Sequence, residues 1–230
     1  MFQSIKKDEI SFHCNGNRSN NVENFYNFDF VKKNKILTIV FSSIENKFIL
    51  RGYNFNTSVL FISEKLMTYY TYQYENLIEY LVDIINENHI HKINLVGSSK
   101  GSFAAINVAI NLEKKLEKQN MRVVAFSPQS YIFPLNENIK GLPSYKNLLS
   151  LSKQYTLMRD DLSRFGNPIE RMIDSNIEIK IIYGGSHKRD EKEAKKLIIN
   201  AIKCMNLSIK KEDEIYRINP CPIRFNTFSG

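Results

Sequence analysis

Residues 92–105 read KINLVGSSKGSFAA, and this stretch decides the interpretation of the chain. An apolar run is followed by GSSKG (97–101) and then by small residues that open a helical pattern. Glycines two positions before and after Ser99 form the pattern GxSxG, which between a buried strand and a helix is typical of a nucleophile elbow. The glycines are needed because strand and helix approach closely around a strained residue. The stretch predicts that Ser99, rather than Ser98, is a nucleophile raised above the edge of a sheet.

The same turn predicts where the negative charge of a reaction intermediate would be held. The backbone N–H of Lys100, the residue after the serine, would point at the oxyanion, and the helix N-terminus adds partial positive charge. A second donor is expected in the loop after an early core strand, where the amide of Ser43 or Ile44 is the candidate. An ordinary polar loop start is the alternative there.

Two other interpretations of the 97–101 motif are open. It could be a plain strand-to-helix turn that happens to contain serine. It could also be a phosphate-binding loop, although the GxxxxGK[ST] pattern of such loops does not fit.

Short apolar runs alternate with amphipathic helices along most of the chain. The hydrophobic patterns predict strands at 36–41, 59–63, 93–98, 121–128, 177–185 and 223–228, and helices at 74–88, 101–118 and 190–205. Residues 1–35 are polar and predict a hairpin or lead-in strand, and 129–176, punctuated by proline and glycine, predict a cap or lid. This alternation predicts a single domain over 1–230 with a parallel sheet covered on both faces, whose ligands bind at the carboxyl ends of the strands.

The composition is that of a globular protein with a basic surface. The chain has 230 residues, 43% of them hydrophobic, and a net charge of +8. The lysines are interleaved with acidic residues, which favours a solvated surface over a polyanion-binding face, and no aromatic–basic motif indicates nucleic-acid binding. No apolar run approaches the ~20 residues of a membrane span, and the start lacks the apolar core of a secretion signal. Three cysteines without CxxC spacing argue against a zinc site or a disulfide framework and fit a cytoplasmic protein.

The elbow and its surroundings resemble one family. GSSKGSFAA after INLV is similar to the GSSKGG elbow of α/β-hydrolase-fold proteins from bacterial surface-polysaccharide and accessory-secretion loci, which include capsule O-acetyltransferases. The similarity extends to LTIVFSS, VLFIS and VVAFSPQ, and so covers most of residues 36–200. Ser102 departs from the pattern, because that family commonly has a second glycine there. The resemblance implies an α/β-hydrolase-like three-layer sandwich with a mainly parallel central sheet.

The acid and base of such a site are harder to identify. The resemblance places the acid in the loop after 177–185, where Asp190 is the candidate, with helix N-capping as the alternative role. A serine needs an imidazole to remove its proton. Among the four histidines, His13 lies in the polar lead-in, and His89 and His91 are expected at the opposite edge of the sheet. His187 is at the correct edge, but it occupies the loop of the acid.

In the resembling family the catalytic histidine follows the last strand, commonly as Ser-Gly-His or Gly-Gly-His. Residues 228–230 (FSG) resemble the start of that loop, which predicts that the chain stops just before the histidine and that turnover is impaired.

The leading expectation for function is serine-based acyl transfer on a carbohydrate, as an O-acetyltransferase or O-acetyl esterase. Ser99 would carry the acyl group, Lys100 and Ser43 would hold the oxyanion, and Asp190 would orient the imidazole, with His187 as the candidate within the chain. No cofactor or metal is implied, and acetyl-CoA would enter only as an acyl donor. The alternative is a non-catalytic protein of the same fold that acts in polysaccharide assembly or export, and neither interpretation sets the oligomeric state.

Overall fold

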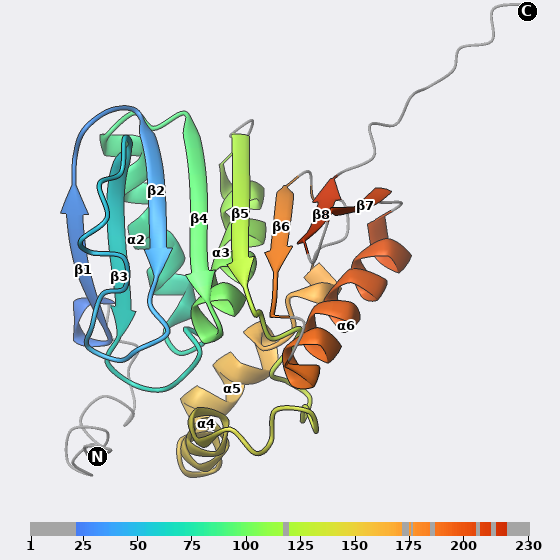
Figure 1. The fold of residues 1–230 in the computed structure, drawn as a ribbon. Helices are drawn as coiled ribbons and strands as arrows, with labels where there is room; N and C mark the ends of the chain where they lie inside the picture. Colours follow the sequence, from blue (N-terminus) through green and yellow to red (C-terminus); the bar gives the residue numbers. More distant parts are fainter. Residues whose placement is uncertain are drawn as a thin grey trace, which may run out of the picture.

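A mainly parallel sheet of eight strands forms the centre of the molecule (Figure 1). The computed structural model describes residues 22–116, 120–171, 175, 177–184, 187–205, 208–212 and 215–219. The strands are β1 (Tyr26–Val31), β2 (Ile36–Phe41), β3 (Ser58–Glu64), β4 (Lys92–Ser98), β5 (Asn120–Phe126), β6 (Glu178–Ile182), β7 (Ser208–Glu212) and β8 (Ile215–Asn219). Their order is β1-β3-β2-β4-β5-β6-β8-β7, and the five strands from β3 to β6 in this order are parallel.

The helices pack on one apolar face of this sheet because alternate strand residues point toward them. Leu95, Val123 and Ile179 lie in register on β4, β5 and β6, and all three are buried. They share one core cluster with residues of α2 (Tyr74–Glu87), α3 (Lys100–Lys115) and α6 (Lys188–Met205). In Figure 1, α2 and α3 lie behind the strands.

The opposite face is covered over β2 and β3 by the segment 42–57. Phe48, Ile49 and Phe55 of this segment pack on Val40, Val59 and Phe61 of the two strands. Farther along this face the cover is thinner, since Arg122 and Phe126 of β5 are exposed. The predicted α/β-hydrolase-like class, with a mainly parallel sheet between two covering layers, is confirmed.

The predicted elements agree with the observed ones to within a few residues. The strands predicted at 36–41, 59–63, 93–98, 121–128 and 177–185 are β2 to β6, and the three predicted helices are α2, α3 and α6. The lead-in strand is β1, which pairs antiparallel with β3. Residues 223–228 and 228–230, predicted as a strand and as the start of a histidine loop, lie outside the described residues.

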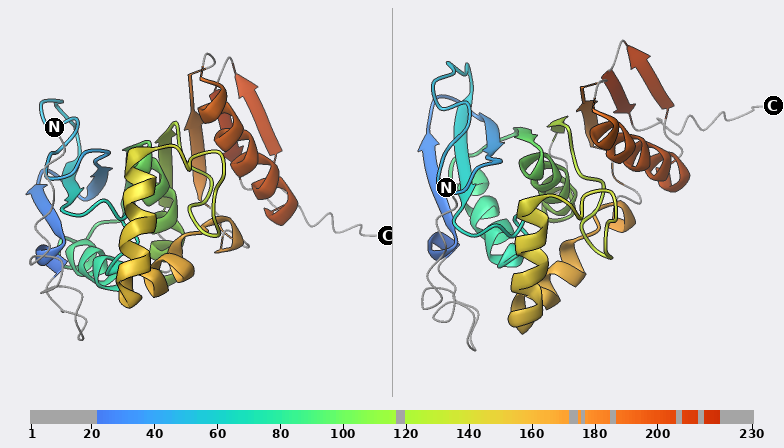
Figure 2. Two further views of the ribbon diagram at one scale, coloured as in Figure 1. Left: turned by 90° about the horizontal axis from the view of Figure 1, so that it is seen from below. Right: turned by 60° about the horizontal axis from the view of Figure 1, so that its bottom comes forward.

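The segment between β5 and β6, for which the sequence predicts a cap or lid, contains more regular structure than the sequence indicates. It contains α4 (Pro143–Gln154), α5 (Thr156–Phe165) and the short helix η2 (Ile169–Arg171). Proline suits the first turn of a helix, so Pro143 opens α4 rather than interrupting it. Tyr145, Leu148 and Leu162 of the cap pack with Phe103 of α3 in a second apolar cluster. Seen from below, α4 and α5 lie across the carboxyl ends of the strands (Figure 2).

The last described strands form a hairpin in which β8 runs antiparallel to β6. Ile215 of β8 is opposite Ile182 at the end of β6, and Ile218 is opposite Ile179 near its start. The chain therefore leaves β8 at the amino edge of the sheet, across from the edge where β4 ends.

A buried carboxylate attaches the loop after β5 to α6. Glu193 is 2% exposed and accepts hydrogen bonds from the Ser130 N–H (3.0 Å), the Ser130 hydroxyl (2.7 Å) and the side-chain amides of Asn136 and Asn138 (both 2.9 Å). Burial opposes ionisation of Glu193, but these donors outweigh it and hold its pKa below the usual value.

We expect Glu193→Gln to destabilise the fold by about 1–3 kcal/mol at pH 7, because ionic hydrogen bonds are replaced by neutral ones. A carboxyl whose pKa is lowered by folding stabilises above its ordinary pKa of about 4.3, and this contribution is lost as the pH falls through the folded-state value. The difference in the free energy of unfolding between variant and wild type should shrink below about pH 4. Urea unfolding at pH 7 and below about pH 4 measures this difference, and Glu137→Gln, at an exposed position, is the control.

Candidate active site

Ser99 occupies the sharp turn that the sequence predicts. It lies between the end of β4 and the first residue of α3, with φ 51° and ψ −120°. A residue with a side chain rarely adopts a positive φ, and such strain persists only where the surroundings impose it. The Ser99 N–H donates to the Phe126 carbonyl of the neighbouring strand (2.8 Å), which holds the turn in place.

The two glycines of the motif are sterically required. A Cβ on Gly97 would lie 2.1 Å from the Gly101 carbonyl oxygen, and one on Gly101 would lie 2.3 Å from the Phe41 carbonyl oxygen. Ser102, the departure from the family pattern, fits because its hydroxyl donates to the Gly97 carbonyl (2.6 Å). The pattern thus produces a close crossing of β4, α3 and the end of β2.

The two amides predicted to hold an oxyanion belong to segments in direct contact. Lys100 is the first residue of α3, so its N–H has no acceptor within the helix. Gly101 packs against Phe41 and Ser42, which brings the start of the loop containing Ser43 to the elbow. The Ile44 N–H donates to the Ser42 hydroxyl (3.1 Å), which leaves Ser43 as the candidate for the second amide.

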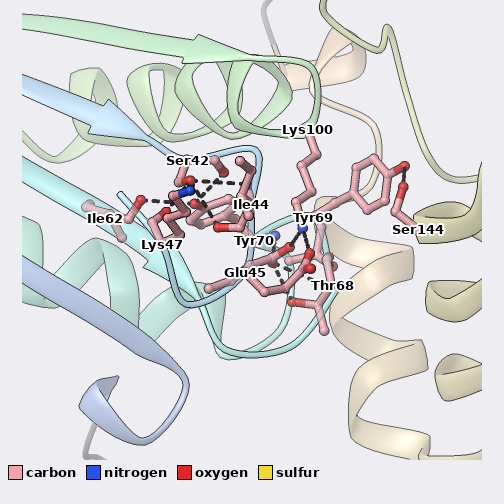
Figure 3. A network of polar contacts seen from close by, with 12 residues as sticks. Ser42, Ile44, Glu45, Lys47, Ile62, Thr68, Tyr69, Tyr70, Lys100 and Ser144 are labelled. Carbon is pink, nitrogen blue, oxygen red and sulfur yellow. Dashed lines mark hydrogen bonds and ion pairs between the residues drawn. The ribbon is translucent and has the colours of Figure 1, made fainter. Parts of the chain in front are cut away.

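The Lys100 side chain reaches the carboxylates of Glu45 and Glu64 (Figure 3). Its ammonium pairs with Glu45 and lies 2.8 Å from Glu64 Oε1. The Lys100 and Glu64 side chains are 4% and 1% exposed. Burial raises the pKa of Glu64 to about 8 and lowers that of Lys100 to about 7, so the surroundings oppose the charged form of each group.

The hydroxyl of Ser99 contacts a residue that the sequence did not single out. The side-chain amide of Gln129, in the loop after β5, donates to Ser99 Oγ at 3.2 Å. Gln129 is 5% exposed and follows the VVAFSP run directly, next to the Ser130 that Glu193 holds. Gln129 comes close to Ser99 because the chain turns sharply after β5, where Ser127 has φ 47°. No sequence pattern predicts this turn.

Asp190 and His187 lie at the same edge of the sheet as Ser99 but do not touch it. Among the described residues, no hydrogen bond or ion pair joins Ser99 to either of them. The His187 side chain is exposed, and the backbone N–H of His187 donates to the Gly184 carbonyl (3.1 Å). The helix α6 begins at Lys188, so Asp190 lies in its first turn and is not the N-cap that the alternative interpretation predicted.

Two of the remaining histidines lie where the sequence predicts them. His89 and His91 lie between α2 and β4, at the amino edge of the sheet, and His13 lies outside the described residues. Over the part of the chain that the structure describes, no three His, Cys, Asp or Glu side chains are grouped so as to hold a metal ion. None of the described helices combines the length and the apolar character that a membrane span needs.

Comparison with known proteins finds distant structural likenesses. No family model and no curated protein matches the chain. A lipase-esterase related protein from Clostridium acetobutylicum matches with 15% identity over 74% of this chain and 86% of its own, with a TM-score of 0.44. An esterase from Pyrobaculum calidifontis matches with 12% identity over 78% and 68%, with a TM-score of 0.48.

We expect Gly97→Ala to destabilise the protein by about 3 kcal/mol or more, because the added methyl would meet backbone atoms that cannot move independently. Urea unfolding measures the loss. Gly141→Ala is the matched control, since a Cβ at Gly141 would meet nothing within 4 Å. Equal stabilities of the two variants would contradict the close crossing at the elbow.

Proposed function

We propose that this chain performs serine-based acyl transfer, as an esterase or O-acyltransferase. The observation that supports it most is the strained backbone of Ser99 at the junction of β4 and α3. That geometry presents a hydroxyl at the carboxyl edge of the sheet, directly before a helix N-terminus, where an oxyanion is stabilised.

In the proposed reaction, Ser99 Oγ attacks the carbonyl carbon of an ester, and its proton passes to a base. The amides of Lys100 and Ser43 hold the resulting oxyanion. When the ester C–O bond breaks, the proton goes to the leaving oxygen and an acyl-serine remains. A hydroxyl or water then attacks this acyl-serine by the reverse steps and regenerates Ser99.

The finer proposal is that the acyl group is acetyl and that the acceptor or substrate is a carbohydrate. The resemblance of GSSKGSFAA to the elbow of capsule O-acetyltransferases supports this assignment. The cap, α4 and α5, lies over the carboxyl edge and would decide whether a sugar hydroxyl or water reaches the acyl-serine. Acetyl-CoA would enter as a donor substrate, in which case the C–S bond of its thioester breaks and the proton goes to the leaving sulfur. The three cysteines without CxxC spacing support a cytoplasmic location.

We expect Ser99→Ala to abolish labelling by a fluorophosphonate probe and to lower kcat for p-nitrophenyl acetate by at least about 1000-fold. Ser98→Ala is the matched control and should label as fast as wild type, because Ser98 is the last residue of β4 and precedes the turn. Labelling that persists in Ser99→Ala would place the nucleophile elsewhere.

Asp190 and His187 are the proposed acid and base. We expect His187→Ala to lower kcat for p-nitrophenyl acetate at least about 100-fold, the contribution of a general base. His91→Ala, at the opposite edge, is the control. A rate unchanged by His187→Ala would exclude His187 as the base.

The second candidate is a non-catalytic binding protein of the same fold. It is favoured by the contact between Ser99 Oγ and the amide of Gln129, which cannot act as a base. Wild-type protein that never labels with a fluorophosphonate, although folded, would support this candidate over the enzyme.

A further inference from the structure

The ammonium of Lys100 is enclosed between two carboxylates from different segments (Figure 3). Glu64 ends β3, and Glu45 belongs to the loop that follows β2. The Lys100 side chain is 4% exposed, so its charge depends on these two partners for the solvation that water would otherwise supply. An ammonium engaged in this way, with Ser99 Oγ bonded to Gln129 instead, is not placed to act as the base for Ser99.

Glu64 is the fixed side of this arrangement. Its Oε2 accepts hydrogen bonds from the N–H groups of Thr68 (3.2 Å) and Tyr70 (2.8 Å) and from the Thr68 hydroxyl (3.1 Å). Tyr69 and Tyr70 both have positive φ, a strained state for bulky residues that these bonds help to hold. Glu64 is therefore fastened to the backbone and cannot follow Lys100.

Glu45 is the adjustable side, and it lies two residues after Ser43. The start of its loop is held at Ser42. The Ser42 carbonyl accepts a hydrogen bond from the Tyr70 hydroxyl (2.8 Å), and the Ser42 N–H donates to the Ile62 carbonyl (2.9 Å). On the far side, the Asn46 N–H donates to the Glu64 carbonyl (3.1 Å). Between these backbone contacts, the pairing of Glu45 with Lys100 joins the loop to the elbow.

We propose that the Lys100 side chain, through Glu45 and Glu64, positions the loop that carries the second oxyanion amide. One residue would then contribute its N–H to the oxyanion site and use its ammonium to fix the other donor, Ser43. This inference rests on the proposed acyl transfer. It assigns a positioning role to Glu45 and Glu64, neither of which would touch the substrate.

The contacts of Lys100 with Glu45 and Glu64, which we call the clamp, matter because oxyanion donors act only at short range. They must lie about 2.7–3.1 Å from the developing charge, and a misplacement of about 1 Å costs about 100-fold in rate. Without Lys100, the loop would still be held at Ser42 and Asn46 and braced by the bond from the Ser42 hydroxyl to the Lys47 carbonyl, so it would fold but would allow Ser43 to shift. Loss of the clamp should therefore lower kcat without weakening ground-state binding.

Glu45→Gln tests the clamp, because Glu45 is 25% exposed and its loss leaves Glu64 to pair with Lys100. We expect kcat for p-nitrophenyl acetate and the rate of fluorophosphonate labelling to fall about 10- to 100-fold, with KM nearly unchanged. The melting temperature should stay close to that of wild type, and hydrogen exchange of the 42–47 backbone should become faster. Lys100→Met should give the same pattern more strongly where it folds, and the exposed Glu137→Gln should change nothing.

Hydrogen exchange separates this inference from the proposed function. Wild-type protein without serine reactivity would contradict acyl transfer, while faster exchange at 42–47 in Glu45→Gln would still support the clamp. Unchanged exchange and unchanged kcat in Glu45→Gln would overturn the clamp. A fall in kcat that merely follows a fall in melting temperature would also overturn it, because it would indicate a role in stability alone.

Discussion

The close crossing of β4, α3 and the end of β2 is the constraint on which the site depends. The backbone of Gly97 meets that of Gly101, and Gly101 meets the Phe41 carbonyl, at distances that leave no room for a Cβ. The chain must therefore turn within one residue, and Ser99 takes the strained dihedral angles that result. A turn this short leaves the serine side chain outside the sheet and starts α3 at Lys100, whose N–H then points beyond the helix.

The same crossing explains why charge is buried beside the elbow. Lys100 leaves the helix toward the ends of β2 and β3, where burial would remove its charge unless carboxylates compensate for it. Glu45 and Glu64 both pair with Lys100, and the contacts of Glu64 with Thr68 and Tyr70 join the loops after β2 and β3 to the elbow. On the other side of Ser99, Glu193 fixes the loop of Gln129 to α6. Ser99 is half-buried, and Gln129, which contacts its hydroxyl, belongs to the loop that Glu193 holds.

The local parts of this structure were predictable from the sequence, and the long-range parts were not. The GxSxG motif predicts the elbow, and the alternating apolar runs predict the parallel strands and α2, α3 and α6. These patterns involve residues that are close together in the sequence. The helices of the cap were missed because proline and glycine were interpreted as interruptions, although Pro143 begins α4. Gln129, Glu45 and Glu64 could not be identified, since each acts through a contact 30 to 55 residues away in the chain or through loops with unusual dihedral angles.

The two candidate functions differ in one proton acceptor, not in the rest of the site. Oxyanion stabilisation is usually the largest single contribution to acyl transfer, and it leaves about 10³- to 10⁴-fold catalysis over water when a triad member is absent. In this chain the elbow, the helix N-terminus and the clamped loop are all built from described residues that hold one another in place. Because this preorganised part is present whether or not an imidazole reaches Ser99, the proposed acyl transfer would persist weakly without a base, and the base would determine its rate.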